Sequence, residues 1–251
     1  MRSMKKTAIS LLVLLSVSSF FARFQMEEIE RHHLERALRP GMDAFGRNCF
    51  SLTLSAISTT LTSTLPVLFF TLLLSIGISL AVSGKNQKLR FFLRSTLDLF
   101  TALPGLLIAL ALGVVFPDSG LTVYFATVLM VMPSTIRYFE SLLLKIRSED
   151  FILASNSMGA PPLHIWIYHL LPALRVSILA VLPFTLLRLI LIETSISFLG
   201  LGHVPEQETW GRLLAQGKDY FMEAPWILFS SALPLCLVLA SFHLLSHEEQ
   251  N

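Results

Sequence analysis

The chain has 251 residues, of which 53% are hydrophobic and only 14% are charged, and its mean hydropathy is +0.67. Soluble proteins carry about 25% charged residues, so this composition excludes a water-soluble domain; an extended disordered chain, which needs low hydrophobicity and high charge, is excluded as well. Two cysteines are too few for a disulfide scaffold of this length, and a net charge of +2 without a basic run gives no sign of nucleic-acid binding. We therefore predict an all-α, polytopic membrane protein that lies in a lipid bilayer and binds no nucleic acid.

Six stretches are apolar enough to predict membrane helices, which need roughly 20 residues each. In chain order they are residues 8–21, 60–82, 99–117, 119–136, 174–192 and 224–245. The first is short and follows three basic residues, so a cleavable signal peptide is the alternative to a retained helix. The second follows an uncharged stretch that we expect at the membrane interface. Lys and Arg are concentrated before the first helix and in the loops 83–96 and 137–175, which places both termini in the cytoplasm.

Motifs that would indicate an enzyme are missing from the sequence. It contains no G-x-x-x-x-G-K-[ST] phosphate loop, no H-E-x-x-H zinc site and no G-x-S-x-G nucleophile elbow. His164 and His169 are five residues apart, a spacing that puts them on different faces of an α-helix and argues against a shared metal ion. We therefore expect a protein that is not an enzyme and has no catalytic or metal-ligating residues.

The loop after the fourth predicted helix contains a different element. Ser148 precedes two acidic residues and an apolar run, which is the pattern of a helix start, and Gly159 followed by Pro161 and Pro162 ends that helix in a sharp corner. The residues that share one face of this short helix are Phe151, Ala154, Ser155 and Met158. Such a helix either lies on the lipid surface or docks to a cytoplasmic partner, and the local pattern does not choose between them.

The same loop resembles the coupling loop of permeases of ATP-binding-cassette importers, which has the pattern E-A-A-x3-G-x9-I-x-L-P. In this chain the aligned residues are Leu153, Ala154, Ser155, Gly159, His169, Leu171 and Pro172. The spacing from the glycine to the proline agrees. Leucine replaces the glutamate, serine replaces the second alanine and histidine replaces the isoleucine. The tail, residues 246–251, has no Lys or Arg, where the family usually has a basic end.

A second region makes the resemblance more specific. The stretch from Glu193 to Trp226 is similar to the C-type permease of the dipeptide, oligopeptide and nickel importer family. The matching positions are Glu193, Phe198, Gly200, Gly202, Pro205, Trp210, Gly211, Leu214, Gly217, Ala224, Pro225 and Trp226. The residues that resemble the family's extracytoplasmic G-x-D-x-x-G-R element are Gly41, Asp43, Gly46 and Arg47. Asp98 and Pro104 lie where its third helix usually has both.

The resemblance implies a fold and a set of partners. Residues 1–47 would form a cytoplasmic tail, the first helix and an extracytoplasmic loop, and residues 48–251 the permease transmembrane domain, with a short cytoplasmic coupling helix between helices 4 and 5. The chain would lie in the inner membrane, pair with a B-type permease, couple to two ATP-binding-cassette ATPases and receive peptides or nickel-type substrates from an extracytoplasmic binding protein. It would bind no cofactor itself, since ATP and magnesium belong to the ATPase subunits.

Two groups of residues would carry this function. The residues expected to couple the loop to the ATPases are Leu153, Ala154, Ser155, Met158, Gly159, Leu171 and Pro172. Arg188 and Glu193 are ionisable residues inside a predicted span, where such residues are rare, so we expect them in the translocation path or gate. They lie about 140° apart around a helix and are not expected to pair. For Arg188 a bond to a partner helix is the alternative.

Other interpretations stay open at this stage. A stand-alone channel or a secondary transporter would need no docking helix. An exporter or a peptide-sensing subunit would belong to the same wider family. Trp210 and Trp226 fit either the membrane interface or a docking face for a binding protein.

Overall fold

The computed structural model describes residues 40–84, 86–116, 120–201 and 208–248. The predicted first helix, residues 8–21, and the choice between a retained helix and a signal peptide lie outside these ranges. The described elements are α2 (Cys49–Val82), α3 (Gln87–Ala102), α4 (Gly105–Val115), α5 (Gly120–Arg147), α6 (Asp150–Ser157), α7 (Pro162–Ile165), a π-helical turn η1 (Trp166–Leu170), α8 (Leu171–Phe198), α9 (Trp210–Asp219) and α10 (Pro225–Glu248). All of these elements are helical, so the predicted all-α class is confirmed.

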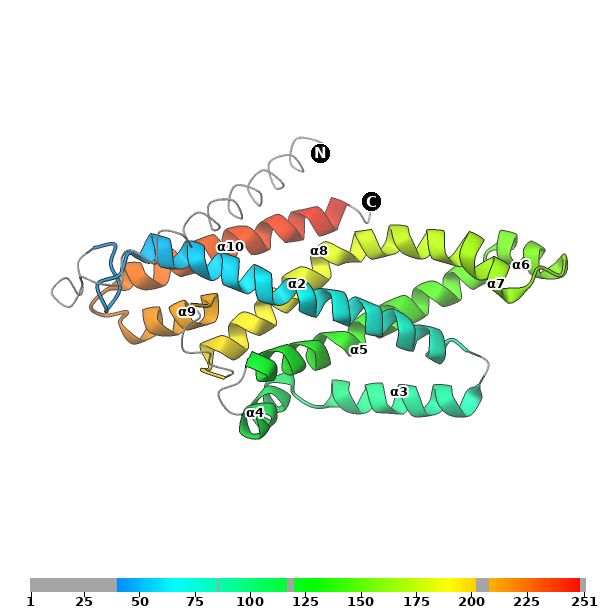
Figure 1. Cartoon of the computed structure of the whole chain (residues 1–251), viewed down its shortest axis with the longest axis horizontal. Helices are drawn as coiled ribbons and strands as arrows, with labels where there is room; N and C mark the ends of the chain where they lie inside the picture. The colour runs from blue at the N-terminus through cyan, green and yellow to red at the C-terminus, as the bar shows by residue number, and fades with distance from the viewer. Residues whose placement is uncertain (1–39, 85, 117–119, 202–207, 249–251) are drawn as a thin grey trace.

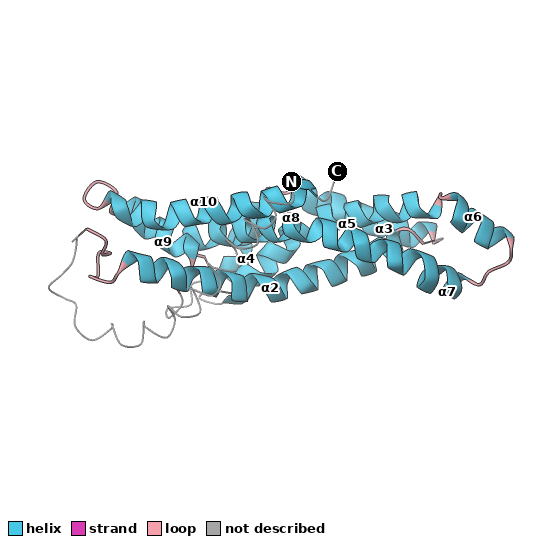
Figure 2. Ribbon diagram, turned by 90° about the horizontal axis from the view of Figure 1, so that it is seen from above, coloured by secondary structure: helices cyan, strands magenta, loops and turns pink. Residues whose placement is uncertain are grey.

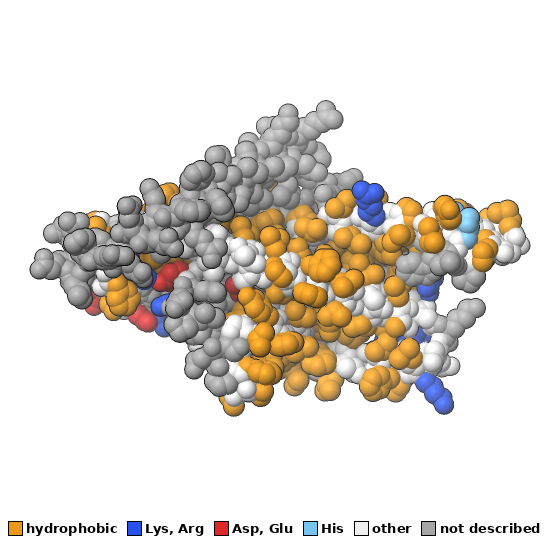
Figure 3. All heavy atoms as spheres, viewed as in Figure 1, with side chains coloured by type: hydrophobic (Ala, Val, Ile, Leu, Met, Phe, Trp, Pro, Cys, Tyr) orange, Lys and Arg blue, Asp and Glu red, His pale blue; other side chains and the backbone are white. Residues whose placement is uncertain are grey.

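The long helices run along one axis of an elongated bundle, as Figures 1 and 2 show. The short helices α6 and α7 lie at one end, and α9 lies toward the other, near the start of α2. On the face drawn in Figure 3, hydrophobic side chains cover the middle of the molecule. The middle of this face (Figure 3) is therefore apolar, as a surface in contact with a lipid bilayer requires.

Among the described residues, four helices are long and apolar enough to cross a membrane. They are α2, α5, the helix Ile167–Phe198, and the part of α10 from Pro225 to Leu244. The pair α3 and α4 would make a fifth span, but the two helices are bent by 92° relative to each other. The predicted span 99–117 is not one continuous helix: its described residues form the end of α3, a break, and α4.

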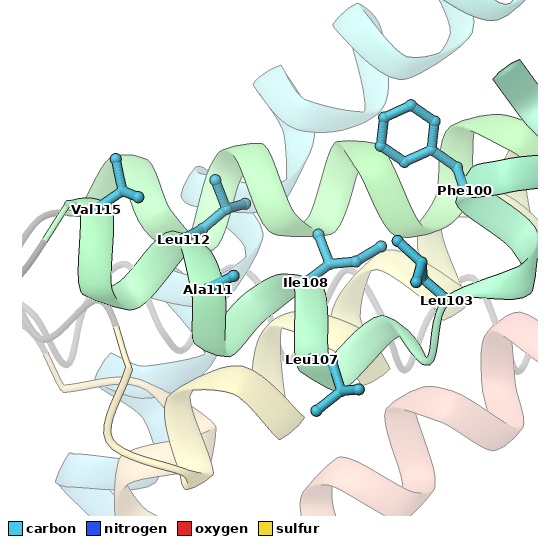
Figure 4. Close-up of a pocket in the computed structure, with 7 residues that line it drawn as sticks. All are labelled: Phe100, Leu103, Leu107, Ile108, Ala111, Leu112 and Val115. Atoms are coloured by element: carbon cyan, nitrogen blue, oxygen red, sulfur yellow. The ribbon is translucent and has the colours of Figure 1, made fainter.

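The break between α3 and α4 has a local cause. Leu103 is extended, with φ −82° and ψ 134°, because a proline ring disfavours the helical conformation of the residue before it, and Pro104 has no N–H to continue the ladder. The apolar groove beside the break has a volume of about 320 Å³. Its lining residues, labelled in Figure 4, are Phe100, Leu103, Leu107, Ile108, Ala111, Leu112 and Val115.

Helix α2 is continuous from Cys49, which corrects the expectation of a separate interfacial stretch before residue 60. Asn48 begins the helix, since its side-chain oxygen accepts hydrogen bonds from the N–H groups of Phe50 at 2.9 Å and Ser51 at 3.4 Å. The sequence offers no break after this cap, because residues 48–84 carry no charge and Pro66 is accommodated inside the helix.

The pair α2 and α5 forms the most extensive contact in the described bundle. The buried hydroxyl residues of α2 are Thr53, Thr60, Thr64, Thr71, Ser75 and Ser79. Small side chains let membrane helices approach closely. Some hydroxyls are satisfied within the helix, as when Thr64 donates to the carbonyl oxygen of Thr60 at 2.7 Å. The largest apolar core cluster joins these two helices to α8, α9 and α10.

Candidate coupling and translocation sites

The short helix α6 lies at the position predicted for the coupling helix, between the spans α5 and α8. Ser148 does not cap it as predicted, because its hydroxyl donates to the carbonyl oxygen of Lys145 at the end of α5. At the other end, Gly159 has φ +80°, and the N–H of Ala160 donates to the carbonyl oxygen of Ser155 at 3.1 Å. Glycine adopts this left-handed conformation without a steric penalty, so Gly159 sets the corner after α6.

The predicted shared face of α6 is exposed except at one position. Phe151, Ala154 and Met158 are exposed, whereas Ser155 is buried, with only 8% of its surface accessible. Leu153, which stands in place of the pattern's glutamate, is also exposed. The remaining predicted coupling residues, Gly159, Leu171 and Pro172, are exposed as well. The loop therefore presents an exposed, largely apolar surface at the end of the bundle.

Ser155 faces inward because it contacts His169. Its hydroxyl lies 3.3 Å from Nε2 of that histidine, and the Phe151 ring lies 5.6 Å from the imidazole, centroid to centroid. The rings of His164 and His169 are 6.1 Å apart, so the prediction that they lie on different faces is wrong. The reason is the π-helical turn Trp166–Leu170, in which residues five apart lie on the same side.

Glu193 is buried inside the bundle, with 5% of its surface accessible. The hydroxyl of Ser63 on α2 donates to its Oε1 at 2.8 Å, and its Oε2 is buried with no hydrogen-bond partner in the described part of the chain. The carboxyl group thus joins α8, five residues before its end, to the middle of α2. This geometry suits an anchor between the two helices or a gate at that level.

Arg188 has different partners, as the spacing of five residues predicts. Its guanidinium donates to Oγ of Ser134 on α5 at 2.6 Å and lies 5.9 Å from the centre of the Phe184 ring. Of the two predicted roles for this residue, the bond to a neighbouring helix is observed within this chain. Arg188 is nevertheless only partly buried.

The G-x-D-x-x-G-R element folds around Asp43. Its Oδ1 accepts hydrogen bonds from the N–H groups of Phe45 at 2.9 Å and Arg47 at 2.7 Å, and its Oδ2 lies 2.8 Å from the Arg47 guanidinium. Arg47 also donates to Oε1 of Glu208 at 2.5 Å. Burial lowers the pKa of the Arg47 guanidinium, but the charges and hydrogen bonds of Glu208 and Asp43 outweigh it and raise the pKa above its ordinary value. The cluster therefore ties the start of α2 to the start of α9.

The two tryptophans of the C-type pattern take different places. Trp210 is fully buried in the core, so it is neither an interfacial residue nor part of a docking face. Trp226 is partly buried, and its indole N–H donates to the carbonyl oxygen of Met42 at 2.9 Å. It holds the start of α10 against the loop before α2.

Two ion pairs between α3 and α5 were not predicted from the sequence. Arg137 donates to Asp98 at 2.7 Å, and Arg94 pairs with Glu140. The signal is present in the sequence, since opposite charges recur four residues apart on α3 and three apart on α5. Within the described ranges, no group of three or more His, Cys, Asp or Glu residues comes together to hold a metal ion.

Comparison with known proteins identifies the family. The model of binding-protein-dependent transport system inner membrane components matches residues 73–247. The chain belongs to this family.

The relatives carry names of transport permeases. A putative peptide transport system permease protein of Brucella suis biovar 1 is 27% identical over 205 residues, which cover 82% of this chain and 69% of that protein. The glutathione transport system permease protein GsiD of Escherichia coli O6:H1 is 26% identical over 82% of this chain and 68% of its own length. The oligopeptide transport system permease protein OppC of Bacillus subtilis is 28% identical, over 58% of this chain and 48% of its own.

Family membership decides between the alternatives drawn from the sequence. The chain is a permease subunit of an ATP-binding-cassette importer, a multi-pass component of the inner membrane, and a transport subunit rather than an enzyme. A stand-alone channel, a secondary transporter and an exporter or sensor subunit are not supported. The family is also consistent with the short helix α6 between α5 and α8.

Proposed function

We propose that this chain is the C-type membrane subunit of a peptide importer. It pairs with a B-type permease on two ATPase subunits, which hold ATP and magnesium, and takes its substrate from an extracytoplasmic binding protein. The observation that supports this most directly is the family match, together with relatives named for peptides, oligopeptides and glutathione. Peptides therefore come before nickel-type substrates as the proposed cargo.

The proposed mechanism is alternating access driven through α6. When ATP closes the ATPase pair, the exposed face of α6 moves with it, and the spans α5 and α8 on either side follow. A short helix held at Ser155 by His169 transmits such a displacement, whereas a flexible loop would absorb it. In this proposal both termini lie in the cytoplasm, and Arg188 and Glu193 act in the path or the gate.

Extraction of the chain from native membranes in a mild detergent, followed by mass spectrometry of the co-purifying proteins, tests the assembly. The expected result is a second permease and an ATPase with a phosphate loop, and ATP-dependent uptake of labelled peptides by vesicles that contain the complex. Recovery of this chain alone, even after cross-linking, would contradict the proposal. A complete complex that transports nickel and no peptide would overturn the proposed cargo.

A further inference from the structure

One face of α5 carries a series of polar contacts. Ser134, Arg137 and Glu140 follow one another at intervals of three residues. Ser134 contacts a side chain of α8, and the other two contact side chains of α3. The contacts are Ser134 with Arg188 of α8 at 2.6 Å, Arg137 with Asp98 at 2.7 Å and with Thr101 at 3.2 Å, and Glu140 with Arg94. We call this set of residues on α3, α5 and α8 the α5 polar strip.

Three charged side chains of the α5 polar strip are exposed, whereas Glu140 is buried and Ser134 and Arg188 are partly buried. The side chains of Asp98, Arg137 and Arg94 are 69%, 50% and 48% exposed. Arg137 lies ten residues before the end of α5, or about 15 Å along the helix, at the border between the predicted span 119–136 and the loop that follows it. Exposed charged groups on a membrane protein face water or another protein chain rather than hydrocarbon, which does not solvate them.

Arg188 is the one arginine of the strip whose charge is not balanced by a carboxylate partner among the residues that the structure describes. Asp98 and Glu140 each have an arginine partner, whereas Arg188 has a neutral hydroxyl and the face of an aromatic ring. Within the described ranges no carboxylate forms an ion pair with Arg188. It lies ten residues before the end of α8, so the excess positive charge is near the middle of the bundle.

We propose that the α5 polar strip lines the water-filled path through the transporter and that Arg188 binds a carboxylate of the substrate there. The assignment of Arg188 to a substrate carboxylate rests on the proposed function, since every peptide with an unmodified C-terminus carries a carboxylate there. A guanidinium offers paired N–H donors that match the two carboxylate oxygens. Its single bond to Ser134 leaves other N–H groups to receive the substrate.

Cysteine labelling tests the water-filled path and the anion site at Arg188 without any substrate. Ser134→Cys is introduced into a chain that lacks its two native cysteines, and the assembled transporter is treated in open membrane fragments with charged methanethiosulfonates. The anionic probe carries a sulfonate and the cationic probe a trimethylammonium group. We expect both to react with the new thiol, because a water-filled path admits either charge.

Arg188 is then tested by the ratio of the two reaction rates. Removing one positive charge beside the thiol with Arg188→Gln should lower the anion-to-cation ratio by about tenfold, whereas Arg188→Lys should keep it. The control chain carries Cys49→Ser alone, so that its one thiol is Cys236, exposed on the apolar surface of α10 beside Leu233 and Leu237. A thiol that faces lipid should not react with either probe.

Two results would overturn the proposal. A thiol at position 134 that reacts with neither probe, or no faster than Cys236, would mean that this face is dry. An unchanged rate ratio in the Arg188→Gln chain would remove the anion site.

Uptake separates this proposal from the function on which it rests. A peptide with a free carboxyl end is compared with its amide, using the same binding protein for the unmodified transporter and for Arg188→Gln. We expect the variant to lose the preference for the free acid by several-fold. Equal losses for both peptides would contradict the carboxylate site. Positive labelling without peptide uptake by the unmodified transporter would instead contradict the peptide cargo.

Discussion

Ser63 supplies the one hydrogen bond that the buried Glu193 carboxyl receives from the described side chains. Ser63→Ala would leave both carboxyl oxygens without a donor, and a buried polar group in that state costs about 1–3 kcal/mol. We expect the apparent melting temperature of the purified complex to fall by about 2–4 °C for each kcal/mol lost. Differential scanning fluorimetry in one detergent measures the change.

Thr62→Ala is the matched control at this site, because Thr62 is the neighbouring residue on α2, is exposed, and donates only to the carbonyl oxygen of Ser58. It should leave the melting temperature almost unchanged. Equal effects of the two substitutions would mean that the Glu193 carboxyl does not depend on Ser63. The anchoring role of Glu193 would then lose its support.

Gly217 allows α9 and α10 to touch. A Cβ atom added there would lie 2.6 Å from the Cα atom of Leu228 and 2.7 Å from its backbone nitrogen. Backbone atoms cannot relieve such a clash by changing rotamer, as a side chain could. Gly217→Ala should therefore destabilise the protein by about 1–3 kcal/mol, the usual cost of overpacking. On α2, Gly77 has no atom within 4 Å of the same position. Gly77→Ala should be neutral or stabilising, and a loss of stability as large as that of Gly217→Ala would contradict the packing explanation.

At the scale of the element, α6 owes its form to Gly159, whose backbone is left-handed while the space around its Cβ position is open. Gly159→Arg should abolish ATP-driven uptake, because a long charged side chain would stand on the exposed face proposed to dock to the ATPase. Gly159→Ala is the control, since it imposes the same backbone strain, about 1–2 kcal/mol, without the bulk. Uptake assays on inserted protein compare the two. Normal uptake by the arginine variant would remove α6 from the coupling mechanism.

Some elements could be predicted from the sequence because their signals are local. The short helix α6 follows from an apolar run bounded by Gly159 and two prolines, and the apolar stretches locate α5, α8 and α10. The break at Pro104 was missed because an uncharged stretch of the right length looks like one span, and only the backbone shows the turn. The histidine pair was misplaced because a π-helical turn changes the periodicity that the prediction assumed.

In the candidate site, too, the charged residues could be predicted from the sequence, whereas their partners, which are far away in the chain, could not. Arg188 and Glu193 stand out in the sequence because charges are rare in apolar segments. Their partners Ser134 and Ser63 lie 54 and 130 residues away, and serines are common in this chain. Ser155 was expected on the exposed face of α6, but its contact with His169 depends on how two helices meet. Pairings of this kind become visible only when the helices are packed.

At the scale of the whole molecule, the bundle is closed at one end by the cluster around Asp43, Arg47 and Glu208. This cluster joins the loop before α2 to the start of α9, two regions that are 161 residues apart in the chain. Gln216 of α9 adds a contact to Asp43 at 3.4 Å. The opposite end, with α6 and η1, is joined by the contact of Ser155 with His169. The long helices α2, α5 and α8 connect these two ends (Figure 1).

Glu208→Gln tests whether the Arg47 ion pair holds this end of the bundle together. The amide keeps the size of the side chain but removes the charge from a group that is 9% exposed, and hydrogen bonds to charged groups contribute about 1.5–3 kcal/mol. We expect a lower melting temperature and faster proteolysis near the start of α9. Glu223→Gln is the control, because Glu223 is an exposed acid in the loop between α9 and α10 and should tolerate the change. If both variants have the melting temperature of the unmodified protein, the ion pair does not stabilise this end of the bundle and serves only to orient Arg47. The buried Trp210 and its apolar neighbours would then hold this end together.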